Sequence, residues 1–404
     1  MGMTPLRDRS AARVRELRPG GAEVERPAGS GFLARFPSML LSREVAVASS
    51  ADQHAPESLP WRSVAAGPVV AVVTLLAALL ATQAAGVPLR DPDNVAGRRL
   101  GWVVCMVVGL VVLDVVVRAA RRSGTLTPSR AAIRSVRRER WSGYRGVVVG
   151  SALISFYVSY LAYRNMKSVV PLLRPGELFD RQLAGLDRGL FGGNDPAALL
   201  HTLLGTGVQT QVLSVVYVFF IIFLPLSLAL AMVFSPDLPG GLFYATALSI
   251  NWPLGAASYL LIPALGPIYA APGAFADLPS SEASHLQGML LDDRLEFLRD
   301  PTASGTAQSI AAFASVHVSM ILTAAVAAHL LGLGRRVRIG LWVLLAATTA
   351  ATIYLGWHYV IDDLAGVVIA IAALAAARVL TGFERRTGRR GRLASGSTVA
   401  RQRA

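Results

Sequence analysis

Two histidines in long apolar stretches are the residues of this chain best suited to chemistry. His317 follows Ser315 and Val316, and His358 follows Gly356 and Trp357. An ionisable side chain is costly inside a membrane span and usually marks a functional site there. Asp362 lies four residues after His358, a spacing at which two side chains meet on one helical face. A histidine held by a carboxylate, with a second histidine nearby, suits acid–base or covalent catalysis.

The composition is typical of a polytopic membrane protein. The 404 residues are 53% hydrophobic and carry a formal net charge of +14. Apolar runs of about 20 residues, long enough to cross a bilayer as helices, alternate with arginine-rich connections. The charge therefore indicates membrane topology and contact with anionic membrane lipids. Nucleic-acid binding is not expected, because the arginines flank the spans and are not interleaved with aromatic residues.

The sequence predicts an all-α polytopic membrane protein with about eight transmembrane helices. The expected spans are 67–85, 101–117, 146–163, 212–234, 242–262, 310–331, 339–357 and 364–380. Residues 286–298, apolar on one face and acidic on the other, are expected to form an interfacial helix.

Four regions follow from this pattern. Residues 1–62 are predicted to be a disordered, arginine-rich tail, and 63–144 to hold two additional helices and a basic linker. Residues 145–382 are expected to be a six-helix catalytic core, and 383–404 a second basic tail.

Arginine distribution predicts the orientation of these spans. With eight spans, both tails, the basic linker and the turn at 335–338 lie on one side, which should be cytoplasmic. His358 lies about 20 residues, or roughly 30 Å of helix, from Arg338 of that turn, and His317 lies about 15 residues, or roughly 22 Å, before the inner turn at Gly332. We therefore expect a multi-pass protein of the cell membrane, with both termini cytoplasmic and both histidines near the extracytoplasmic face.

Lys167 is the only lysine in the chain, and Arg174 follows it on the same expected side of the membrane. A lysine point charge and an arginine fork together suit a phosphate group. The alternative is a pair of basic side chains that snorkel at a helix end. The position of both residues on the side of the two histidines favours the phosphate interpretation.

Three sequence blocks together resemble the signatures of the type-2 phosphatidic acid phosphatase superfamily. The blocks are Lys167 with Arg174-Pro175, then Ser315-Val316-His317, which is usually Pro-Ser-Gly-His, and finally His358 with Asp362 and Gly366. The resemblance covers about residues 145–382, which this superfamily folds as a six-helix core.

The third block departs from the common signature, which begins with Ser-Arg. Ala351 and Thr352 occupy those two positions, so an expected phosphate-binding arginine is absent. The sequence of residues 352–362 is similar to that of the inositol phosphorylceramide synthase branch, which also lacks that arginine. Enzymes of that branch transfer a phospho-alcohol headgroup between lipids.

The resemblance implies a role for each matched residue. His358 would attack phosphorus and form a phospho-histidine, and Asp362 would fix the tautomer of His358. His317 would protonate the leaving oxygen and then deprotonate an incoming alcohol or water. The phosphoryl oxygens would be bound by Lys167, Arg174 and Ser315. No cofactor and no metal is expected, and Asp363 should point away from the site because neighbouring helical residues diverge by about 100°.

The predicted function is an integral membrane phosphotransferase that transfers a phosphoinositol-like headgroup from a phospholipid or polyprenyl phosphate substrate. A lipid phosphate or polyprenyl diphosphate phosphatase is the first alternative, because water could replace the acceptor alcohol. A non-enzymatic transporter or scaffold is the second. A transporter predicts internal repeats and charges near the bilayer centre, and a scaffold leaves the His358–Asp362 spacing unexplained.

Overall fold

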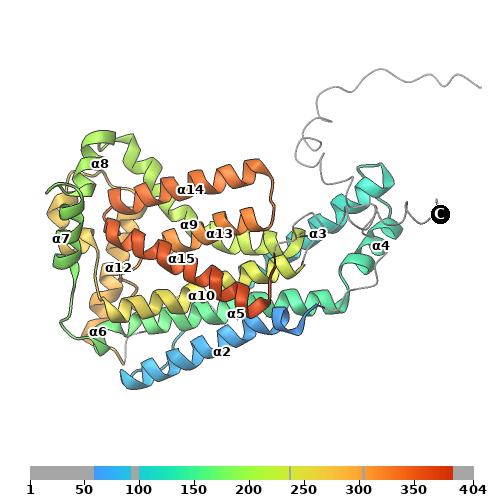
Figure 1. Ribbon diagram of the computed structural model, residues 1–404, viewed down its shortest axis with the longest axis horizontal. Helices are drawn as coiled ribbons and strands as arrows, with labels where there is room; N and C mark the ends of the chain where they lie inside the picture. Colours follow the sequence, from blue (N-terminus) through green and yellow to red (C-terminus); the bar gives the residue numbers. More distant parts are fainter. Residues whose placement is uncertain (1–58, 92–99, 236–237, 303–304, 385–404) are drawn as a thin grey trace, which may run out of the picture. The chain divides into compact units, whose positions relative to one another are not determined.

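The computed structural model describes residues 59–91, 100–235, 238–302 and 305–384, and every element in these residues is helical (Figure 1). The expected tails, 1–62 and 383–404, lie outside the described residues except at 59–62 and 383–384.

Eight long or apolar helices correspond to the expected spans. They are α2 (Trp61–Ala84), α3 (Leu100–Ser123), α5 (Gly143–Ser168), α9 (Val208–Phe234), α10 (Leu238–Leu261), α13 (Val316–Leu330), α14 (Arg335–Tyr354) and α15 (Val360–Thr381). Six of them, α2, α3, α5, α9, α14 and α15, are long and apolar enough to cross a membrane. The structure therefore confirms an all-helical polytopic membrane fold.

The remaining two helices, α10 and α13, form the interior of the bundle. Most of the α10 residues are buried, and α13 has only 15 residues, 11 of them buried. Asn251 of α10 donates to the Ala247 carbonyl at 2.8 Å and to the Thr323 hydroxyl of α13 at 3.2 Å, and it accepts from the Ser319 hydroxyl. Asn251 lowers the apolarity of α10, and Ser319 and Thr323 that of α13, but their hydrogen bonds satisfy these side chains inside the bundle.

Short helices cover one end of the bundle, on the left of Figure 1. They are α6 (Val170–Leu173), α7 (Asp180–Leu190), α8 (Pro196–Leu204), α11 (Pro267–Ala270), η3 (Pro272–Phe275) and α12 (Glu282–Arg299). The helix α12 contains the expected amphipathic segment 286–298. The basic helix α4 (Arg130–Arg140) lies at the opposite end (Figure 1).

The sixth expected span begins later than the sequence predicted. Residues 310–315 are not helical, and α13 starts at Val316. Tertiary hydrogen bonds hold this segment extended. Ala312 N–H donates to the Ala264 carbonyl, and Ala314 N–H donates to the Ser258 hydroxyl, each at 2.9 Å. His317 therefore lies in the first turn of its helix.

The seventh expected span ends earlier than predicted, so the expectation that His358 and Asp362 share one helical face is wrong. Gly356 has a φ of +74° and ends α14. The N–H groups of Gly356 and Trp357 return to the carbonyls of Ile353 and Thr352, which is the hydrogen-bond pattern of a Schellman motif. His358 consequently lies in the turn between α14 and α15.

Gly366 allows α15 to pack directly against the backbone that precedes α13. A Cβ atom at this position would overlap the Ser315 carbonyl oxygen. Neither backbone can move aside easily, because Ser315 N–H is bonded to the Asp362 carbonyl of the same α15 at 3.0 Å. Close approach at Gly366 thus keeps the two histidine-bearing segments together.

We predict that Gly366→Ala destabilises the fold by about 1–3 kcal/mol, the usual effect of overpacking, and lowers any activity of the site. Gly340→Ala on α14 is the matched control, because a Cβ there meets no atom within 4 Å. Thermal unfolding in detergent should show a lower midpoint for Gly366→Ala and an unchanged or slightly higher one for Gly340→Ala. Equal midpoints for the two variants would contradict this packing account.

Candidate active site

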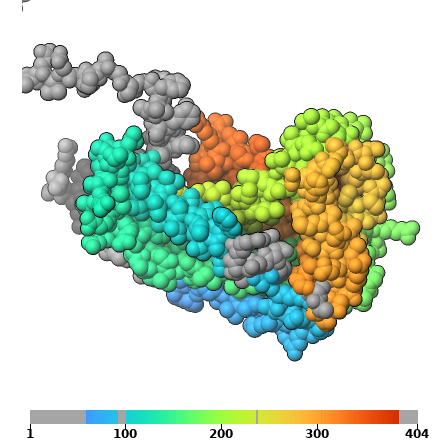
Figure 2. Space-filling model, turned by 180° about the vertical axis from the view of Figure 1, so that it is seen from behind, coloured from blue at the N-terminus to red at the C-terminus, as the bar shows by residue number. Residues whose placement is uncertain are grey.

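A cavity of about 650 Å³ contains both histidines and Lys167. Side chains from α3, α5, α9, α10, α11, α12 and α13 line it, together with the turn that carries Trp357 and His358. In Figure 2 the surface is hollowed between α9 (lime) and α12 (orange). A concave pocket with mostly aliphatic and aromatic walls and a few converging polar groups is the usual form of a small-molecule or lipid site.

Aromatic rings fix the position of His317. The imidazole stacks on Tyr217 of α9, with ring centroids 4.5 Å apart, and lies 4.3 Å from the ring of Phe220. Tyr217 in turn stacks on Trp357 at 4.7 Å, with the rings nearly parallel. Sequence reasoning missed Tyr217 and Trp357, because aromatic residues in apolar segments give no signal that separates a site wall from a packed core.

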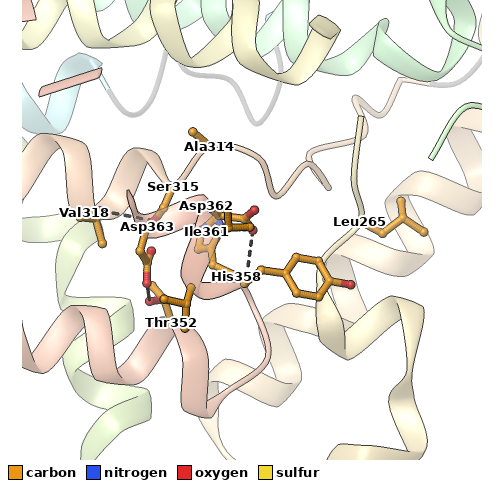
Figure 3. A network of polar contacts seen from close by, with 12 residues as sticks. Leu265, Ala314, Ser315, Val318, Thr352, His358, Ile361, Asp362 and Asp363 are labelled. Atoms are coloured by element: carbon orange, nitrogen blue, oxygen red, sulfur yellow. Dashed lines mark hydrogen bonds and ion pairs between the residues drawn. The ribbon is translucent and has the colours of Figure 1, made fainter. Parts of the chain in front are cut away.

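His358 faces His317 across the cavity and is held from behind by Asp362. The two imidazole centroids are 5.9 Å apart, and only 6% of His358 is exposed. Nδ1 of His358 lies 3.5 Å from Oδ2 of Asp362 (Figure 3). This separation is longer than a normal hydrogen bond, a common state of catalytic contacts without substrate. Asp362 Oδ2 also accepts the Tyr359 N–H at 2.9 Å, which fixes the carboxylate at the start of α15.

Ser315 serves as a structural cap. Its side chain is fully buried, and its hydroxyl accepts the Val318 N–H at 3.5 Å as the N-cap of α13. The side chain lies against Asp363 and is not among the described residues that line the cavity. The expected contact between Ser315 and phosphoryl oxygens therefore stays a prediction from resemblance.

Asp363 is buried in a polar cluster and is not among the described residues that line the cavity, and the expectation that it points away from the site stays a prediction. Oδ2 of Asp363 accepts a hydrogen bond from the Thr352 hydroxyl at 3.0 Å (Figure 3). Thr352 stands where the superfamily signature has its arginine, and it is fully buried. The Thr352 side chain is thus committed to Asp363 and supplies no group to the cavity.

The two expected phosphate-binding cations lie in different places. Lys167 lines the cavity, with Nζ 5.0 Å above the ring of Tyr259 and 5.8 Å above that of Tyr163. Arg174 is not among the described lining residues. Its guanidinium donates to the Leu260 carbonyl at 2.6 Å and pairs with Glu177. Arg164, one turn before Lys167 on α5, also lines the cavity, a position the sequence did not single out.

Two carboxylates of α7 hold the loops around His358, and sequence reasoning missed both. Asp187 accepts the Val360 and Ile361 N–H groups at 2.8 and 3.0 Å, which caps the N-terminus of α15. Burial raises the pKa of Asp187, and these two backbone hydrogen bonds oppose the shift. Asp180 accepts the Gly266 N–H at 2.8 Å and the Tyr359 hydroxyl at 3.1 Å. Both residues are isolated acidic residues in a polar connection, and no sequence pattern there predicts these hydrogen bonds.

Within the described residues, no three His, Cys, Asp or Glu side chains gather in a way that could hold a metal ion. The polar groups that line the cavity include two imidazoles, two cationic side chains and the carboxylate of Asp293. These groups can form a bond to phosphorus, move protons and neutralise phosphate charge.

We predict that Tyr217→Leu lowers turnover about 10- to 100-fold, because a displaced acid–base group costs rate steeply. Tyr217→Phe keeps the stacked ring and should retain activity within about threefold. Phe219→Leu, on the exposed side of the same helix, is the control. Steady-state rates of the three purified variants test the stacking role, and equal rates for Tyr217→Leu and Phe219→Leu would contradict it.

Comparison with known proteins agrees with the resemblance over this part of the chain. Residues 181–376 match the family model of the PAP2 superfamily. The matched stretch contains His317, His358 and Asp362. It begins after Lys167, so Lys167 lies outside it. The match supports the superfamily and does not single out the inositol phosphorylceramide synthase branch. No curated protein and no solved structure gave a match.

Proposed function

Taking residues 181–376 as a PAP2 superfamily region in an all-helical membrane protein, we propose that this chain is a membrane phosphotransferase that acts through a phospho-histidine. The observation that carries the proposal is the position of two imidazoles, 5.9 Å apart, on one cavity with Lys167. A lipid phosphate fits this arrangement, because its phosphate can reach the polar groups while the rest of the molecule stays in the membrane.

In the first step, a ring nitrogen of His358 attacks phosphorus. Asp362 lies beside Nδ1, which leaves Nε2 as the attacking atom. A P–N bond forms as the P–O bond to the leaving group breaks, and His317 gives its proton to the departing oxygen. The Asp362 carboxylate orients the His358 ring and stabilises the positive charge that develops on it.

In the second step, an acceptor alcohol attacks the phospho-histidine. Neutral His317 now takes the proton of the hydroxyl, a P–O bond forms, and the P–N bond returns its electron pair to His358. Water could take the place of the alcohol, and the outcome would then be hydrolysis. The same residues serve transfer and hydrolysis. Which reaction occurs depends on whether the cavity admits an acceptor alcohol or water.

Lys167 is the proposed electrostatic partner of the phosphoryl oxygens. It lies at the cavity wall on the last turn of α5, and its aromatic surroundings keep the charge poorly hydrated and strongly interacting. We leave Arg174 out of the phosphate site, because Leu260 and Glu177 hold its guanidinium. Arg174 instead fixes the loop that follows α6.

The cavity favours a substrate headgroup larger than a bare phosphate. Within the described part of the chain, the indole N–H groups of Trp252 and Trp357 are buried without a hydrogen-bond partner, and both residues line the cavity. Such donors suit the hydroxyl oxygens of a phospho-alcohol. Thr352 stands at the position where the superfamily signature has arginine. The site therefore lacks one positive charge that would bind a terminal phosphate. Transfer of a phosphoinositol-like headgroup is therefore our preferred reaction.

The proposed location of the site is the extracytoplasmic face of the cell membrane. Support comes from the arginine-rich segments, because α4 and the first turn of α14 are both strongly basic and positive charge favours the cytoplasmic side. The short helices around the histidines lie at the end of the bundle opposite α4 (Figure 1).

We predict that His358→Ala and His317→Ala each lower turnover by about 10³-fold or more, because each removes a reacting group. His329→Ala is the matched control, an exposed histidine at the other end of α13. The assay offers phosphatidic acid, polyprenyl diphosphate or phosphatidylinositol to purified protein, with and without an acceptor alcohol. Acceptor-dependent lipid product indicates transfer, and released phosphate indicates hydrolysis. Wild-type rates in either site variant would overturn the assignment.

A further inference from the structure

The cavity extends well beyond the histidines, along the facing sides of α5 and α9. Phe156 and Tyr157 of α5 line this extension, opposite Phe220, Ile221 and Leu224 of α9. We call these five residues the slot. Phe156 precedes Lys167 by eleven positions on one helix, which corresponds to about 16 Å along the axis. The slot therefore reaches from the polar end of the cavity toward the middle of two membrane-spanning helices.

The rim of the slot is apolar and lies on the outer surface of the membrane-spanning helices. Ile221 lines the cavity and is also 54% exposed, and Trp102 of α3 lines it and is 74% exposed. Both α3 and α9 are apolar enough to cross a membrane. The face shown in Figure 2 is hollowed between α9 and α12. An opening through the sides of such helices communicates with hydrocarbon, so its natural occupant is a hydrocarbon chain.

The polarity of the cavity changes from one end to the other. Lys167, His317 and His358 form the polar end, whereas the slot offers aromatic and aliphatic surface. A ligand that matches both ends carries a phosphate joined to a long apolar chain. Neither a free phosphate nor a soluble sugar phosphate would use the slot.

We propose that the slot binds the hydrocarbon chain of the lipid substrate, which enters sideways from the bilayer between α5 and α9. The identity of the headgroup end rests on the proposed function above. The inference also gives α3, one of the two additional helices, a role, because Trp102 and Val103 form one wall of the chain site. These residues lie outside the stretch that matches the superfamily model.

The test is photo-crosslinking of the full chain in lipid nanodiscs with phosphatidic acid that carries a diazirine on one acyl chain. Peptide mapping by mass spectrometry should place most of the label on the five slot residues, Phe156, Tyr157, Phe220, Ile221 and Leu224. Excess unlabelled phosphatidic acid should remove that label, and labelling of the outward-facing Val215 and Ile222 should persist, because bulk lipid contacts them. Uniform labelling of α9 that unlabelled lipid does not displace would overturn the proposal.

Two neighbouring residues supply a matched pair of variants. Ile221 lines the slot, and Ile222 is 59% exposed beside it but is not among the described lining residues. Ile221→Trp should fill the slot and lower the displaceable label at least fivefold, whereas Ile222→Trp should leave it unchanged. An equal effect of both substitutions would contradict the slot. If Ile221→Trp does not fold, the label map of the unsubstituted chain decides.

The crosslinking does not depend on turnover, so it separates this inference from the proposed function. His358→Ala should keep the displaceable label in the slot. A slot that is labelled as expected in a protein whose His358→Ala variant retains activity would support the chain site and refute the phospho-histidine mechanism. Loss of activity in His358→Ala without any displaceable label would support the phospho-histidine mechanism and refute the chain site.

Discussion

The candidate site depends on one backbone contact, the hydrogen bond from Ser315 N–H to the Asp362 carbonyl. It joins the first turn of α13 to the first turn of α15, and each of these turns lies next to one histidine. Gly366 makes the contact possible because it carries no Cβ where α15 meets the Ser315 carbonyl. His317 and His358 come from separate helix–turn units, and this contact fixes the distance between them. Ser315 and Gly366 belong to two of the blocks that resemble the superfamily signatures. Packing, as well as chemistry, therefore accounts for these residues.

Buried loops around the histidines need partners for their backbone groups, since an unpaired N–H in a dry site is costly. Carboxylates of α7 supply these partners. Asp180 and Asp187 accept backbone N–H groups from the loop after α10 and from the start of α15, and Asp362 caps its own helix. The histidines can therefore lie on irregular backbone and still be held rigidly. In the mechanism proposed above, a rigid and poorly hydrated site would strengthen the interaction of Lys167 with phosphate and disfavour water as the acceptor.

The helices were predictable from apolar runs, because the bilayer sets their length. The ends of the sixth and seventh spans were not. Residues 310–314 are as apolar as a span, but bonds to Ala264 and Ser258 hold them extended. The early end of α14 follows from Gly356, whose left-handed φ no periodicity reveals.

The chemistry of the site was predictable only in part. The order and residue types of the blocks placed His317, His358 and Lys167 on one side, and the structure brings all three to one cavity. Arg174 was expected there from spacing, yet a salt bridge and a carbonyl contact hold it elsewhere. Tyr217 and Arg164 were missed because their importance comes from which helices face each other, and that is a tertiary property.

The central claim is that phosphorus becomes bonded to His358 during turnover. The direct measurement is mass spectrometry of protein that turns over one of the offered lipids, quenched within milliseconds under alkaline conditions that preserve a P–N bond. The account predicts an acid-labile phosphoryl-linked adduct on the peptide that contains His358, and its absence in His358→Ala. Active protein that shows no adduct on His358 at any quench time, or an adduct on another residue, would contradict the account.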